Sequence, residues 1–104
     1  MIRVNLRDFS KTPGGRYRRS GEFSAEEFRE DWLKPKLEEA MSKGCSLRVD
    51  LDGTAGLAAS FLDGAFTWIA LLGFDAIDTL EIVSNEQPRY ALEIMQNMQS
   101  MFNG

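Results

Sequence analysis

Apolar and polar residues alternate with a period of two in three short stretches of the chain. These stretches are residues 2–7, 46–52 and 79–83. In the second of them Leu47, Val49 and Leu51 alternate with polar residues. A period of two is that of a strand with one buried and one solvated face. We therefore expect a sheet with one largely uncovered face.

Three longer stretches carry apolar residues at the spacing of a helix. They cover residues 24–43, 58–72 and 88–102. The apolar stripe of the first consists of Phe28, Trp32, Leu33, Leu37, Ala40 and Met41, and that of the last of Ala91, Ile94, Met95, Met98 and Phe102. Ser24 and Glu27 form a capping-box pattern at the start of the first helix. Pro35 lies inside its stripe and predicts a kink in one continuous helix.

The helix expected over residues 58–72 is apolar nearly all round. A chain of 104 residues builds one modest core, and this helix is expected at its centre. Its polar residues Ser60, Asp63 and Thr67 fall three and four apart on one narrow stripe. We expect this stripe to be where the helix meets solvent.

Apolar residues border the start of this polar stripe. Gly56 and Leu57 precede the helix in the chain, and Trp68 lies at its flank. An apolar centre with a polar rim suits a specific protein contact. Trp68 is explained equally well as a core residue, so both interpretations stand.

Turn residues separate the predicted elements. Thr12-Pro13-Gly14-Gly15 is a strong turn signal. After it, residues 16–19 are expected to return as a short strand antiparallel to the first, and residues 73–75 to form a loop. The predicted order is β-β-α-β-α-β-α in a single domain of residues 1–104. This is an α/β fold with a small mixed sheet and helices mainly on one face.

Charge is distributed unevenly along the chain. The net charge is −4, yet residues 1–21 hold six basic side chains and one acidic, a balance of +5. Arg16, Arg18 and Arg19 form a possible basic patch. Arginine on a short edge strand is also a common protection against aggregation. Nucleic-acid binding through this patch is an alternative function, although the rest of the chain is acidic.

Composition restricts the compartment and the chemistry. No apolar run reaches the ~20 residues of a membrane span, and the amino terminus alternates as a strand does and is not typical of a signal peptide. Cys45 is the one cysteine and is expected to be reduced and buried in a cytoplasmic protein. There is no histidine, which excludes histidine triads and histidine metal sites. No cofactor is expected.

One motif indicates an alternative enzymatic function. Asp50-Leu51-Asp52-Gly53-Thr54 resembles the DxDGT signature of haloacid-dehalogenase-like phosphatases, and Ile82-Val83-Ser84-Asn85 resembles their second motif. This resemblance implies a nucleophilic Asp50, a general acid/base Asp52 and a bound magnesium ion. That family also needs a later lysine and an acidic pair, and no lysine follows Lys43. The phosphatase stays an alternative.

A second resemblance covers nearly the whole chain. The segments Gly15-Arg16-Tyr17-Arg18, residues 26–30, residues 33–37, residues 49–54 and residues 60–66 resemble a bacterial family of STAS-like domains of unknown function. Pro35 and the Asp52-Gly53-Thr54 triplet are then family features. The resemblance implies a non-enzymatic interaction domain in signalling.

Related STAS domains include anti-sigma-factor antagonists, which bind a GHKL-type, histidine-kinase-like ATPase and are switched by serine phosphorylation. The resemblance implies Ser60 as the corresponding serine, since the preceding family position holds Ala59. A phosphate at the start of a helix would meet free backbone N–H groups and add charge to a docking surface. A simple capping role for Ser60 explains the residue as well.

Overall fold

Three parallel strands form the sheet of this protein. The computed structural model describes residues 1–103, without the side chains of residues 102 and 103. The strands are β1 (Ile2–Asn5), β2 (Leu47–Asp50) and β3 (Leu80–Val83), in the spatial order β1-β2-β3. The register places Val49 between Val4 and Ile82. The alternation predicted for β2 is confirmed, because Leu47 and Val49 are fully buried while the residues between them are not.

Helical segments fill the rest of the chain. They are α1 (Leu6–Phe9), the 3-10 turn η1 (Arg18–Ser20), α2 (Ala25–Phe28), the π-helical turn η2 (Arg29–Leu33), α3 (Lys34–Lys43), α4 (Ala59–Phe66), the 3-10 turn η3 (Thr67–Leu72), α5 (Phe74–Thr79) and α6 (Pro88–Asn103). No helix of the described residues is both long and apolar enough to cross a membrane.

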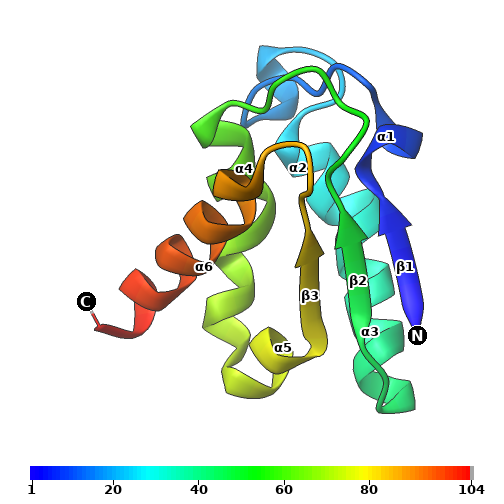
Figure 1. Ribbon diagram of the computed structural model, residues 1–104, viewed down its shortest axis with the longest axis vertical. Coiled ribbons are helices and arrows are strands. Elements are labelled where there is room, and N and C mark those ends of the chain that lie inside the picture. Colours follow the sequence, from blue (N-terminus) through cyan, green and yellow to red (C-terminus); the bar gives the residue numbers. More distant parts are fainter. Residues whose placement is uncertain (104) are drawn as a thin grey trace.

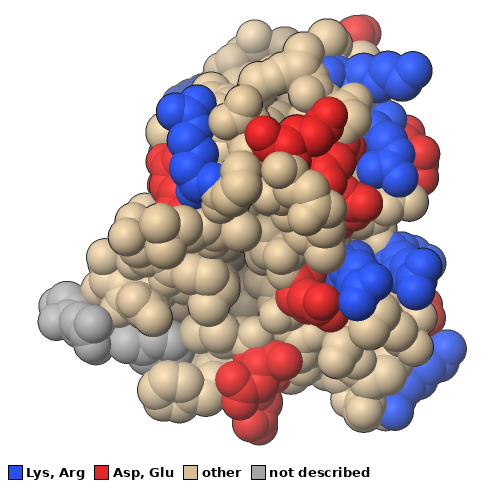
Figure 2. Space-filling view, viewed as in Figure 1, with Lys and Arg blue, Asp and Glu red and all other residues tan. Residues whose placement is uncertain are grey.

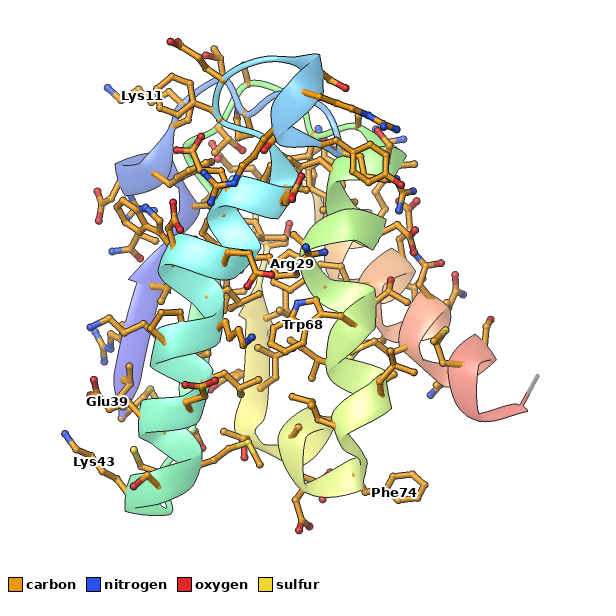
Figure 3. All side chains as sticks on the ribbon, turned by 180° about the vertical axis from the view of Figure 1, so that it is seen from behind. Lys11, Arg29, Glu39, Lys43, Trp68 and Phe74 are labelled. Atoms are coloured by element: carbon orange, nitrogen blue, oxygen red, sulfur yellow. The ribbon has the colours of Figure 1, made fainter. Side chains whose placement is uncertain are left out.

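The helices cover mainly one face of the sheet, as expected. Seen from the two opposite sides, α3 and α4 lie on the same face, and α6 packs beside β3 and η3 (Figures 1 and 3). Each crossover joins neighbouring parallel strands in the same direction, and right-handed connections then place both sets of helices on one side. The α/β class is therefore confirmed.

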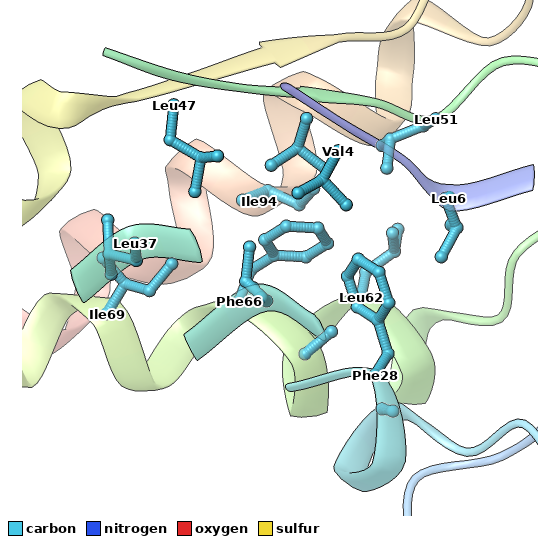
Figure 4. Packing of buried hydrophobic residues seen from close by; sticks show 14 of the residues in the cluster. Val4, Leu6, Phe28, Leu37, Leu47, Leu51, Leu62, Phe66, Ile69 and Ile94 are labelled. Atoms are coloured by element: carbon cyan, nitrogen blue, oxygen red, sulfur yellow. The ribbon is translucent and has the colours of Figure 1, made fainter. Parts of the chain in front are cut away.

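The core lies between this helical layer and the sheet. Figure 4 shows Phe28, Phe66 and Leu62 packed beneath the strand side chains Val4 and Leu47. Leu33, the last residue of the π-helical turn, and Ile69 of η3 are fully buried, and Ile94 of α6 is almost fully buried. The central position of the helix that follows β2 is thus confirmed.

The predicted second strand does not form, and the sheet is parallel rather than mixed. Residues 14–16 instead pair through their backbone with residues 23–26 around the start of α2, and Arg18 begins η1. Gly14 N donates to Phe23 O at 2.8 Å, and Ala25 N donates to Gly15 O at 2.8 Å. β1 ends at Asn5, where the chain turns into α1, and it pairs with β2 within the described sheet.

The helix predicted over residues 24–43 is continuous but contains a π-helical turn before Pro35. Lys34 N donates to Arg29 O, five residues back. The wider turn shifts the buried face by one residue. Leu33 is therefore buried, whereas Trp32 is 36% exposed, which corrects the predicted stripe at that position and at exposed Met41.

Two other predictions near the chain's middle and end need correction. Residues 73–75 were expected as a loop, but Phe74 begins α5. The helix over residues 58–72 is α-helical only through Phe66 and continues as the 3-10 turn η3. In α6, Met95 is exposed while Ile94 and Met98 are buried; Phe102 lies outside the described side chains.

Candidate functional site

Three loops gather at the carboxyl ends of the parallel strands. They are residues 10–24, 51–58 and 84–87, at the top of Figure 1. Ala55 N donates to Lys11 O at 2.7 Å and joins the first two loops. Glu86 N donates to Asp52 Oδ1 at 2.9 Å, and Gly53 N donates to Glu86 Oε1, which join the second and third. The loop end of the molecule is therefore one connected surface.

Asp50 anchors the turn that follows β2. Its Oδ1 accepts from Asp52 N at 2.9 Å, and its Oδ2 lies 3.4 Å from Arg7 Nη1. Thr54 Oγ1 donates to Leu51 O at 3.0 Å. Gly53 has φ +85°, and a Cβ there would lie 2.7 Å from Arg7 Cδ, so a side chain would be both strained and obstructed. Asp50, Gly53 and Thr54 of the DxDGT sequence thus each have a role in the turn itself.

The phosphatase residues Asp50, Asp52, Ser84 and Asn85 do meet at one edge, because β2 and β3 are adjacent and parallel. Figure 2 shows acidic side chains gathered at this end of the sheet. Ser84, however, is 9% exposed and its Oγ donates to Gln87 O at 2.6 Å. Among the described residues no group of three Asp, Glu, Cys or His side chains is placed to hold a metal ion. The strand order never reverses, so the sheet has no switch-point crevice of the kind in which α/β enzymes bind ligands.

Ser60 lies in the first turn of α4 and is half-buried. The helix is capped by Ala58, which provides no side-chain acceptor, so Ser60 is not the N-cap that the simpler interpretation required. Within the part of the chain that the structure describes, the Ser60 hydroxyl has no hydrogen-bond partner. It is the unengaged hydroxyl of the predicted polar stripe.

Asp63, one turn further along α4, is held by two partners. Arg16 Nη1 lies 2.6 Å from Asp63 Oδ2, and Thr67 Oγ1 donates to Asp63 Oδ1 at 2.7 Å. The hydrogen bond from Thr67 and the Arg16 guanidinium lower the pKa of the Asp63 carboxyl, against a smaller opposing effect of burial. Two sites predicted separately, the polar stripe and the basic patch, therefore meet at this ion pair.

The other two arginines of the predicted patch are also engaged. Arg18 Nη2 lies 3.0 Å from Asp31 Oδ1, and this hydrogen bond raises the pKa of Arg18. The Arg19 guanidinium stands over the Tyr17 ring, 4.8 Å from its centroid. Two of the three positive charges are thus neutralised within the molecule, which disfavours a nucleic-acid interface here.

The apolar neighbours predicted for the polar stripe are mostly covered. Leu57 is 8% exposed, and its N–H donates to Tyr90 Oη at 3.0 Å. Trp68 is half-buried against the core, and its Nε1 donates to Ala65 O at 2.7 Å. Figure 3 shows Trp68 on the helical face below Arg29. Gly56 is exposed, and so are Ala55, Ala58 and Ala59. Small side chains, rather than large apolar ones, therefore surround Ser60 at the start of α4.

Three residues that fix this surface were missed from the sequence: Arg7, Glu86 and Tyr90. Each acts across a sequence separation of more than thirty residues. Arg7 follows β1, and parallel strands bring their carboxyl ends together. That rule could have placed Arg7 beside Asp50, had the sheet been predicted as parallel.

A separate cleft opens at the opposite end of the strands. It has a volume of about 440 Å³ and is lined by Met41, Gly44, Cys45, Ser46, Asp75, Asp78 and Thr79. Cys45 is half-buried and has no imidazole to activate it. The thiol by itself does not indicate a functional site.

The chain was compared with known protein families, curated proteins and solved structures. No family model, no curated protein and no solved structure matches the chain.

Proposed function

We propose that the chain is a non-enzymatic, STAS-like interaction domain of bacterial signalling. In this proposal a GHKL-type ATPase or kinase binds at the start of α4, and phosphorylation of Ser60 switches the contact. The observation that carries the proposal is the Ser60 hydroxyl, which is unpaired among the described residues beside a fixed Arg16–Asp63 ion pair.

The start of α4 suits a phosphate for a physical reason. The N–H groups of Phe61 and Leu62 donate to Ala58 O, at 3.0 and 3.2 Å. No side chain caps the helix, so the first-turn N–H groups before them remain available to an acceptor. A phosphate on Ser60 would also place two negative charges near the positive end of the helix.

The Arg16–Asp63 pair would respond to that phosphate. Ser60 lies one helical turn before Asp63, on the same side of α4. A phosphate there competes for the Arg16 guanidinium, and phosphate binds arginine in a bidentate manner. Loss of the Arg16–Asp63 contact would release the Arg16 side chain from α4, which changes the surface that a partner meets.

The element order supports the resemblance in part. The strand-turn-helix unit of β2 and α4, followed by β3 and α6, matches the expected arrangement. The expected second strand is absent, so the complete STAS order is not part of the support.

The test is the binding of Ser60→Asp to a GHKL-type ATPase, the proposed class of partner, as the probe. An acidic residue in the first turn of a helix is tolerated, so the melting temperature should change little while binding is lost. Ser42→Asp, at an exposed position of α3, is the matched control and should bind as the unchanged protein does. Wild-type affinity in Ser60→Asp would contradict the proposal.

A further inference from the structure

Two partly exposed aromatic side chains contact a common third ring at the start of the long helix of residues 25–43. Phe23 is 40% exposed and Trp32 is 36% exposed. Both rings stand edge-on against Phe9 of α1, with centroids 5.5 and 5.7 Å from the Phe9 centroid. Figure 3 shows α1, in dark blue, next to the cyan helix that carries Trp32. We call these two rings, supported by Phe9, the Phe23–Trp32 patch.

The backbone at both positions of the patch has an uncommon conformation. Phe23 has φ +55°, in the left-handed region that side chains other than glycine rarely adopt, and such residues concentrate at binding sites. Trp32 lies in the π-helical turn η2, and single π-helical turns are frequent at functional sites. Tryptophan is highly buried on average. This turn therefore leaves at the surface a side chain that folding alone would bury.

The patch lies in an acidic segment of the chain. Residues 22–32 hold five acidic side chains and one basic side chain. One further cation, Arg18, reaches Asp31 from the preceding loop. The hydrogen bond to Asp31 and the charges of Asp31, Glu27 and Glu26 raise the pKa of this guanidinium. Two positive charges thus face five carboxylates, and the remaining negative charge attracts a cation to the exposed rings.

An arginine side chain is the cation that fits this patch best. A guanidinium group stacks on an aromatic face while its edge donates hydrogen bonds to carboxylates, whereas an ammonium group is a point charge and does not stack. If a large aromatic side chain presents about 200 Å² when fully open, the two rings expose on the order of 150 Å². That area matches one side chain rather than a whole protein face. The surplus of carboxylates disfavours nucleic acid, whose phosphates they would repel.

We propose that the Phe23–Trp32 patch binds an arginine side chain in a basic segment of a partner protein. None of the three rings belongs to the start of α4. Failure of this proposal therefore leaves the proposed function untouched, and the reverse also holds.

NMR of isotope-labelled protein tests the proposal, with the acetylated and amidated peptide Arg-Gly-Arg-Gly-Arg as the probe. The peptide is raised to about 5 mM, which fills most of a site with a Kd of about 1 mM. The indole N–H signal of Trp32 should shift, whereas that of Trp68, which donates to Ala65 O, should not. A peptide with citrulline in place of arginine keeps the shape and loses the charge, so it should bind at least about fivefold more weakly, the equivalent of about 1 kcal/mol.

Substitutions of aromatic residues by leucine locate the site. Trp32→Leu keeps an apolar side chain without an aromatic face, and it should weaken binding at least about fivefold, measured from the amide signal of Phe23. Phe74→Leu is the matched control, since Phe74 is a 68% exposed aromatic side chain on α5; this variant should bind as the unchanged protein does. Circular dichroism checks that each variant is folded.

Four results would overturn the proposal. The first is a Trp32 indole signal that does not move at about 5 mM peptide, which shows that the patch is not a binding site. Equal binding of the arginine and citrulline peptides shows that the patch does not select a cation. Equal binding of a peptide with lysine in place of arginine shows that stacking of the guanidinium is unimportant. Unchanged affinity in Trp32→Leu shows that the peptide binds elsewhere.

Discussion

Gly64 is the position at which the loop of residues 14–16 crosses α4. A Cβ there would lie 3.0 Å from Arg16 Cγ and 3.1 Å from Ala25 Cβ. Alanine is the better helix former by about 1 kcal/mol, but overpacking typically costs about 1–3 kcal/mol. Gly64→Ala is therefore expected to lower the free energy of unfolding, measured with urea.

Adding Arg16→Ala to Gly64→Ala tests whether close packing against the Arg16 side chain causes the loss of stability. Removing the Arg16 side chain relieves one of the two close contacts, so the cost of Gly64→Ala should shrink in that background. A stabilised Gly64→Ala protein would show that α4 and the loop are not in tight contact.

Because the pKa of Asp63 is lowered in the folded protein, the free energy of unfolding is expected to fall in acid. The cause is the hydrogen bond from Thr67 and then the contacts with Arg16. Because the folded pKa lies below the unfolded value of about 3.9, the stabilisation is complete above that pH and is lost as pH falls through the folded pKa. The stability difference between the wild type and Asp63→Asn should therefore be constant from pH 7 to 5 and shrink below about 4.

Urea midpoints at a series of pH values measure this difference. Ser42→Ala, a change at an exposed position without an ionisable group, is the control, and its effect on stability should not vary with pH over this range. A difference that stays constant down to pH 3 would contradict the assigned contacts.

At the scale of elements, Ser24 begins the long helix of residues 25–43. It is 1% exposed, and its Oγ accepts from Glu27 N at 3.1 Å. Ser24→Ala should cost about 1 kcal/mol of stability, whereas Ser42→Ala, at an exposed site in α3, should cost little. Equal effects of the two changes in urea unfolding would show that the cap is unimportant.

Local patterns predicted the elements that depend on local physics. The N-cap at Ser24, the buried face of β2 and the start of α6 at Pro88 follow from side-chain spacing and capping chemistry. Trp32 was assigned wrongly because the π-helical turn shifts the buried face by one residue. The spacing of apolar residues does not reveal such a turn, because the turn depends on how the whole helix packs.

Predictions that depended on pairing between distant residues were less accurate. The turn signal at residues 12–15 is real, but the backbone after it pairs with the start of α2 instead of with β1. The candidate residues Arg16 and Asp63 were identified, although their contact was not, since forty-seven positions separate them. Spacing along one helix or strand cannot predict such a contact.

At the scale of the whole molecule, the sheet topology argues against phosphatase activity. The sheet has no switch-point crevice, and Asp50 is engaged with Arg7 and with the turn. We expect no hydrolysis of p-nitrophenyl phosphate in the presence of magnesium. Hydrolysis that is lost in Asp50→Asn but kept in Asp78→Asn, at the other end of the molecule, would contradict this expectation and favour the phosphatase alternative.

The central claim is that a partner docks on the loop end at the start of α4. Titration of isotope-labelled protein with a GHKL-type ATPase, followed by amide NMR, tests it most directly. If a partner docks there, the amides of residues 14–18 and 58–67 should shift or broaden, while those of α3 and the open sheet face should not. Perturbation confined to other surfaces, or none at saturating ATPase, would contradict it.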